Sequence, residues 1–218
     1  KFKIFLLVLI TALLGGCASE KSRAVQTEAV KSAQIPYSGV KMSVSVGRFS
    51  NQSSYNNGIF SDGEDRLGNQ AQTILISNLQ QSGRFSVMDR TNMRALREEA
   101  TISKKAQNLK GANYVVTGDI VEFGRKTTGD HQLFGILGRG KTQTAYSKVT
   151  LNLVNVTTSE VVFTASGAGE YELSNREVIG FGGTAGYDST LNGKVLSLAI
   201  REAVDNLAIG VENSGLLK

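Results

Sequence analysis

VFTASGAGEYEL, residues 162–173, alternates between two kinds of side chain. The odd positions are small or apolar, namely Phe163, Ala165, Gly167, Gly169, Tyr171 and Leu173. Most even positions are polar, as at Thr164, Ser166, Glu170 and Glu172, with Ala168 as an exception. Such alternation predicts a β-strand with one apolar face, and the run is about as long as a tilted strand that crosses a bilayer. We therefore predict that the odd-numbered side chains face lipid.

A second alternating run follows this strand. After a turn around Asn175 and Arg176, EVIGFGGTAGYDS (177–189) returns with apolar or small odd positions, so 161–188 is predicted to form one β-hairpin. The segment 121–152 fits a second hairpin around a Gly-rich turn. Four strands leave two open edges, which hydrocarbon does not tolerate, so a transmembrane barrel needs several copies of the chain. The alternative is an ordinary sheet with one packed face and one wet face.

The remainder of the chain alternates between predicted strands and helices. Alternation or β-branched residues predict strands over 40–49, 84–89 and 113–123, and helical spacing predicts helices over 67–79, 91–100, 103–109 and 191–207. We expect an α/β (α+β) domain, with a sheet backed by helices and two β-hairpins per subunit that contribute to an oligomeric barrel. Between the first strand and helix lies a long run of turn formers, residues 50–65, and such loops tend to be functional.

The first residues have the pattern of a secretory signal. Two lysines precede an apolar run that is too short to span a bilayer as a permanent helix and that ends at Cys17, the only cysteine. This end resembles the bacterial lipobox, which implies cleavage after residue 16, lipidation of Cys17 and, because Ala18 follows, sorting to the outer membrane. Residues 17–38 contain few large apolar side chains, which predicts a flexible lipidated tether before a domain over 39–218.

Few residues could support catalysis or ligand binding. With one histidine, His131, which we expect in an exposed loop, and one cysteine that we expect to be acylated, we predict no catalytic residue, no metal site and no cofactor. Without Lys1 and Lys3, 22 basic and 19 acidic residues remain and are interspersed, so we predict no nucleic-acid partner.

One octapeptide fits the spacing of a phosphate-binding loop. GILGRGKT (135–142) has that spacing, but the Thr- and Val-rich residues that follow it predict a strand. A phosphate-binding loop needs a helix there, whose N-terminal amides face the phosphates. We therefore predict no nucleotide partner.

Several segments together resemble one family. They are AQTILISNLQQSGRFSVMDRTNMRALREEA (71–100), NYVVTGDIVEF (113–123), VTLNLVNVTTSEVV (149–162) and GYDSTLNGKVLSLAIREAVDNL (186–207). In this order, and after a lipobox, they resemble the CsgG family, the curli production assembly/transport component. The resemblance runs over nearly the whole chain after Cys17.

The resemblance implies a ring-forming lipoprotein of the outer membrane with its main domain in the periplasm. Each subunit is then expected to give two hairpins to a shared barrel that exports unfolded curli-like or other fibre or adhesin subunits without ATP, with accessory factors as possible further partners. In such proteins the loop after the first strand narrows the channel, which here points to Tyr55, Asn56, Asn57 and Phe60. The alternative function is a non-pore envelope lipoprotein that acts as an adaptor or appendage anchor.

Overall fold

The protein, described here by a computed structural model, forms one mixed sheet with helices against it. The structure describes residues 29–55, 64–131, 139–177 and 190–217. The strands are β1 (Met42–Asn51), β2 (Phe85–Met88), β3 (Tyr114–His131), β4 (Arg139–Asn155) and β5 (Val161–Glu177). The helices are the 3-10 helix η1 (Lys31–Gln34) and the α-helices α2 (Arg66–Gln81), α3 (Met93–Ile102) and α4 (Thr190–Asn213).

The sheet has the order β2-β1-β3-β4-β5. The sheet is mixed: β1 runs parallel to both β2 and β3, whereas β3, β4 and β5 form an antiparallel meander. Parallel pairs need a crossover connection, and α2 supplies the one between β1 and β2. The predicted α+β class is therefore confirmed for the sheet and its helices.

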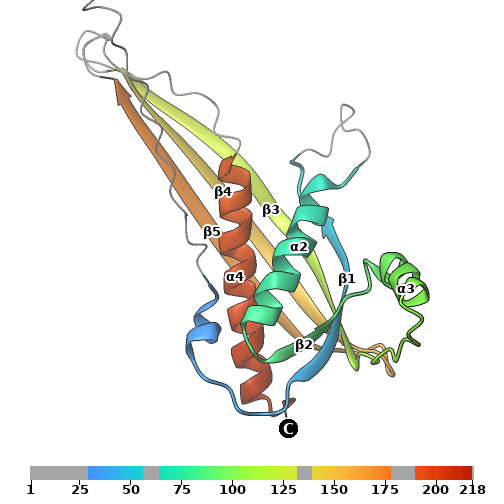
Figure 1. The fold of residues 1–218 in the computed structure, drawn as a ribbon. Coiled ribbons are helices and arrows are strands. Elements are labelled where there is room, and N and C mark those ends of the chain that lie inside the picture. Colours follow the sequence, from blue (N-terminus) through green and yellow to red (C-terminus); the bar gives the residue numbers. More distant parts are fainter. Residues whose placement is uncertain (1–28, 56–63, 132–138, 178–189, 218) are drawn as a thin grey trace, which may run out of the picture.

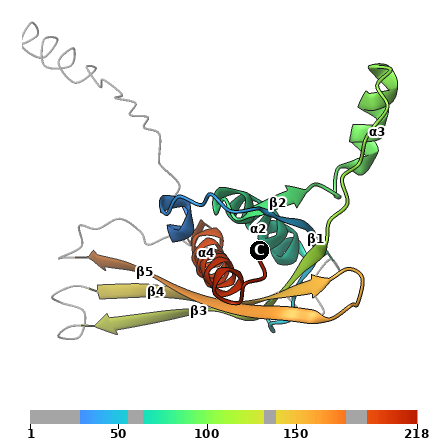
Figure 2. The same ribbon diagram turned by 90° about the horizontal axis from the view of Figure 1, so that it is seen from below.

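Both long helices cover the same face of the sheet. α2 and α4 lie side by side against it, and below β3, β4 and β5 no described helix covers the opposite face (Figures 1 and 2). The core lies between these layers and includes Leu75, Leu79, Phe85, Ile120, Leu151, Leu153, Leu196, Ile200 and Leu207, all fully buried. This one-sided cover explains why the strands alternate between apolar and polar residues.

Most predicted elements are confirmed with small shifts at their ends, but the helix expected over 103–109 is wrong. α3 ends at Ile102, and Lys104 takes a left-handed backbone conformation with a φ of 53°. Residues 103–110 are all exposed, so the apolar side chains that suggested a helix have no core to pack against.

Three of the four strands predicted for the hairpin region lie within the described residues. β3 and β4 form one long hairpin, but β5 pairs with β4, and the return strand predicted after residue 177 lies outside the described residues. The residues after Lys141 are indeed strand, as the argument against a phosphate-binding loop required. The backbone of His131 ends β3, opposite Arg139, and so belongs to a strand and not to a loop as expected.

Candidate functional site

Tyr55 fixes the first end of the long loop to the domain. Its hydroxyl accepts a hydrogen bond from Asn192 Nδ2 at 3.0 Å, and its ring centroid lies 4.7 Å from that of Phe123. The side chain of Asn51 donates to the Tyr55 carbonyl at 2.8 Å. Tyr55 therefore joins the loop to the first turn of α4 and to β3. The other residues expected in a constriction, Asn56, Asn57 and Phe60, lie outside the described residues.

Asp65 holds the two ends of the loop together. One carboxylate oxygen accepts from the backbone N–H of Asn51 at 2.8 Å, and the other accepts from Gly68 N–H at 2.7 Å, which caps α2. A Cβ at Gly68 would lie 2.3 Å from this carboxylate, so glycine permits the close approach. The sequence drew attention to the loop's aromatic and amide residues and missed this anchor, although an aspartate just before a helix is a common N-cap signal.

Loss of this anchor should loosen the loop without unfolding the sheet. For Asp65→Ala we expect a loss of about 1 kcal/mol in the free energy of unfolding, typical of an N-cap, together with faster proteolysis between residues 52 and 64. Thermal melting and limited proteolysis measure the two effects. Glu64→Ala is the matched control, because Glu64 is the neighbouring acid but not the N-cap, and its ion pair with Arg66 is exposed on both sides. An equal change in both variants would contradict the proposed role of Asp65.

The odd-numbered face of β5 packs against α4. A Cβ at Gly167 would lie 2.3 Å from both the Ala199 carbonyl oxygen and the Ala203 nitrogen, and one at Gly169 would lie 2.7 Å from Leu198 Cβ. Ala165 on the same face is also buried. In this structure a helix occupies the position predicted for lipid, because the small residues allow the helix backbone to lie directly on the strand.

The ends of the odd-numbered face also contact the helix or the core. At the start of β5, the Phe163 ring packs so closely on Gly210 of α4 that a Cβ at this glycine would overlap the ring. Further along, Tyr171 and Leu173 are half-buried against the core, and Lys194 Nζ lies 5.1 Å from the Tyr171 ring centroid. The lipid-facing assignment is thus corrected for the whole set 163–173: the structure places it within the domain.

The three long strands continue past the first turn of α4 (Figure 1). β3, β4 and β5 contain 18, 17 and 17 residues. A strand that crosses a bilayer needs about 9–11 residues. Each strand is therefore long enough to pack one part against the helical layer and to extend the other part well beyond it.

Two strand edges in the described sheet lack a neighbouring strand. β1 pairs with β3 only as far as Ile120, so residues 121–131 of β3 have one open edge. β5 is the last strand of the described sheet, and no described strand pairs with its outer edge. Asn206 Nδ2 covers one carbonyl of that edge by donating to Ser166 at 2.8 Å. Open edges bind additional strands, and these two lie on opposite sides of the meander.

The segment that follows the tether is held by Asp205. This buried carboxylate accepts from the backbone N–H groups of Lys31 and Ser32 at 2.9 and 2.8 Å, and Val30 is fully buried beside them. Residues 29–38, expected to be part of a flexible tether, therefore begin the folded domain. Residues 17–28, with Cys17, lie outside the described residues.

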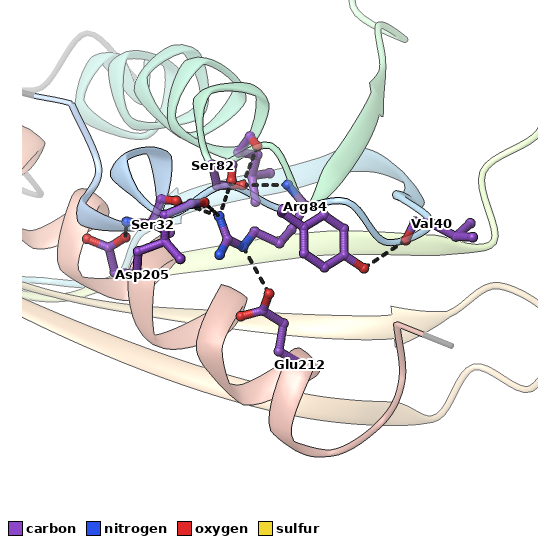
Figure 3. A network of polar contacts seen from close by, with 9 residues as sticks. Ser32, Val40, Ser82, Arg84, Asp205 and Glu212 are labelled. Atoms are coloured by element: carbon purple, nitrogen blue, oxygen red, sulfur yellow. Dashed lines mark hydrogen bonds and ion pairs between the residues drawn. The ribbon is translucent and has the colours of Figure 1, made fainter.

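A buried arginine completes the attachment of this segment (Figure 3). One terminal nitrogen of the Arg84 guanidinium donates to the carbonyl oxygens of Ser32, Ile35 and Ser82, and its Nε donates to Glu212 at 3.3 Å. The guanidinium also lies 5.3 Å from the Tyr37 ring centroid. No sequence pattern singled out Arg84, because its partners include two distant segments, around Ser32 and at Glu212.

Residues 25–217 match the family model of the curli production assembly/transport component CsgG. The chain belongs to the CsgG family. This chain is 66% identical over 200 residues to "Putative lipoprotein NMB1126/NMB1164" of Neisseria meningitidis serogroup B. The match covers 92% of this chain and 90% of the relative. The description of the CsgG family names assembly and transport, not an enzymatic activity.

Two solved structures of low sequence identity align with much of the chain. A PelC dodecamer variant from Paraburkholderia phytofirmans is 19% identical, with a TM-score of 0.40 and coverage of 78% of this chain and 91% of that one. Lipoprotein GNA1162 from Neisseria meningitidis is 12% identical, with a TM-score of 0.34 and coverage of 81% and 99%.

The described residues contain no cluster of three or more His, Cys, Asp or Glu side chains that could hold a metal ion. In the same part of the chain, no helix has the length and apolar character needed to cross a membrane.

Proposed function

We propose that this CsgG-family chain is an envelope lipoprotein that assembles head to tail into a ring and exports unfolded protein subunits without ATP. In each copy β5 and the return strand predicted up to residue 188 form the second hairpin, that hairpin pairs with the open edge of β3 in the next copy, and the strand ends beyond α4 form a shared antiparallel barrel in the outer membrane. The lipid on Cys17 anchors each copy, and the main domain lies in the periplasm. The substrates are curli-like or other fibre and adhesin subunits.

The observation that carries this proposal is that β3, β4 and β5 extend beyond their helix, with an open edge of β3 at one side and the last described strand, β5, at the other. A β-strand edge cannot remain unpaired in hydrocarbon, and edges on opposite sides of one subunit permit a closed ring of identical contacts. The match to the CsgG family over residues 25–217 supports the same assembly.

The two described ends of the long loop are fixed to the domain. Tyr55 bonds to Asn192 in the first turn of α4, next to the place where the strands leave the helical layer, and Asp65 bonds to Asn51. We propose that Asn56, Asn57 and Phe60 extend from this fixed base and narrow the channel. Aromatic and amide groups stack on and hydrogen-bond to an extended chain of any sequence, and the narrow opening excludes folded proteins.

A proline on the open edge of β5 tests ring formation. The Ser166 carbonyl points outward to Asn206, and N–H and C=O of one residue share a side of the strand while successive residues alternate. The register is regular from Phe163 to Glu177, so Glu172 also points its N–H outward. Glu172→Pro therefore removes a donor that the adjoining strand of the barrel needs, but no bond to β4, and edge positions tolerate proline.

We expect Glu172→Pro to abolish channels while the subunit stays folded. The measurement is single-channel conductance of lipidated, detergent-extracted protein in a planar bilayer, with circular dichroism as the check on folding. The native chain and the side-chain control Glu172→Ala should give stable, uniform steps. Silence from intact, membrane-bound native protein would favour the non-pore adaptor.

A further inference from the structure

Helix α3 projects from the domain as an arm (Figure 2). None of its ten residues is buried. Met93, Leu96 and Ala100 are spaced i, i+3 and i+7 and so share one face, and Leu96 is 43% exposed. A ten-residue helix gains little stability on its own in water and depends on packing of its apolar face. The arm therefore has the character of a helix that lacks its partner.

The base of the arm holds it in a defined position. The Asp89 carboxylate accepts from the Asn92 side chain at 2.7 Å and from the backbone N–H groups of Thr91 and Asn92 at 2.9 and 3.1 Å. These hydrogen bonds lower the pKa of Asp89 below its ordinary value, and the bond from the Asn92 side chain has the largest effect. Arg90 crosses to the returning chain and donates to the Lys110 carbonyl at 2.8 Å.

The arm carries an excess of positive charge. Residues 89–110 contain six cations, Arg90, Arg94, Arg97, Lys104, Lys105 and Lys110, and three acids, Asp89, Glu98 and Glu99. Of these, Arg94 pairs with Glu98 at 3.0 Å within the helix. A partner that covers the apolar face should therefore present apolar side chains bordered by carboxylates.

A surface of this kind lies on the opposite side of the same subunit. Glu202, Asn206 and Ile209 are spaced i, i+4 and i+7 on α4, and the bond from Asn206 to Ser166 places this stripe along the outer edge of β5. Ile209 is 49% exposed and Glu202 has 43% of its side chain exposed. We call this stripe the α4 flank. The turn before β5 adds exposed Glu160 and Val161.

We infer that the α3 arm of one copy docks on the α4 flank of the next copy in the ring. This inference rests on the proposed head-to-tail assembly. Figure 1 shows α3 beyond β1, on the side of the sheet away from β5. When the second hairpin of a neighbour, which begins with β5, joins the β3 edge, that neighbour brings its α4 flank to the side where α3 projects. Leu96 then covers Ile209, and Arg97 lies near Glu202.

Paired cysteines test the contact, and the size of the extracted oligomer tests the ring. In the lipidated full chain, we expect Leu96→Cys with Ile209→Cys to give a ladder of disulfide-linked oligomers on non-reducing gels. Light scattering of the same detergent-extracted protein, kept reduced, should show one oligomer size. That oligomer without a disulfide ladder would overturn the arm contact and leave the ring intact. A monomer would contradict the ring itself.

A charge on the apolar face of the arm gives an independent readout. Leu96→Asp should lower the detergent concentration that half-dissociates the oligomer at least tenfold, whereas Ala95→Asp, on the opposite helix face, should change it less than twofold. Equal effects from the two variants would overturn the contact. A normal oligomer from Leu96→Asp, with lost binding to vesicles of anionic phospholipid, would also overturn it and assign the arm to a membrane surface.

Discussion

Gly167→Val is expected to destabilise the subunit by about 3 kcal/mol, the upper part of the usual range for overpacked cores. A Cβ at this position would lie 2.3 Å from the Ala199 carbonyl oxygen and the Ala203 nitrogen. Both atoms belong to the backbone of α4, so no side-chain rotation relieves the contact and the helix must move off the sheet. The strand preference of valine returns at most about 1 kcal/mol.

Thermal and denaturant unfolding of the soluble, non-lipidated domain measure this loss. The melting temperature should fall by about 6–12 °C for a domain of this size. Ala168→Val is the matched control, since it adds a similar volume one residue away on the exposed face, and it should change the melting temperature by less than about 2 °C. Equal tolerance at the two positions would mean that α4 does not rest on β5.

The same contact changes how a charge at this position should be interpreted. Gly167→Arg is expected to abolish membrane-inserted oligomers, as the lipid-facing hypothesis also predicted, but through unfolding of the α4 contact. The two causes differ in the soluble domain, where lipid is absent. A normal melting temperature for soluble Gly167→Arg would restore lipid as the partner of this face.

Arg84→Met should cost about 3 kcal/mol and release the segment 29–37. Methionine keeps much of the apolar stem, but all four hydrogen bonds from the guanidinium disappear. Removing one partner from a buried ion pair costs about 3–5 kcal/mol. We expect the low end, because Glu212 keeps 32% of its side chain exposed and water can solvate it, whereas Arg84 keeps only 3%.

The release of the segment distinguishes this loss from general destabilisation. Limited proteolysis below the melting temperature should cut Arg84→Met within residues 29–37 well before the native chain. Arg94→Met is the control, because Arg94 forms an exposed pair on α3 that is worth about 0.3–0.5 kcal/mol. Asp205→Asn should add little to Arg84→Met, since both residues hold the same segment and coupled sites are not additive. Full additivity would mean that the two residues act independently.

The periodicity of the sequence predicted most of the secondary structure and the family. Alternation located β1 and β5, the β-branched run located β3, and helical spacing located α2 and α4, because each pattern reflects the geometry of a single element. The resemblance to the CsgG family depended on ordered segments of the chain and is confirmed over residues 25–217. The helix expected over 103–109 is wrong, because these residues are exposed and lack a core contact that could stabilise a helix.

Only the tertiary structure decided what each apolar face contacts. Alternation in 162–173 shows that one face avoids water, but a helix and a lipid tail exclude water alike, so the pattern cannot distinguish them. Gly167 gained its meaning from the backbone of α4, which is distant in sequence. Arg84 and Asp205 likewise became an anchor for residues 29–37 only because folding brings three segments together. The sequence determined local periodicity and family membership by itself, whereas contacts between distant segments depend on the fold as a whole.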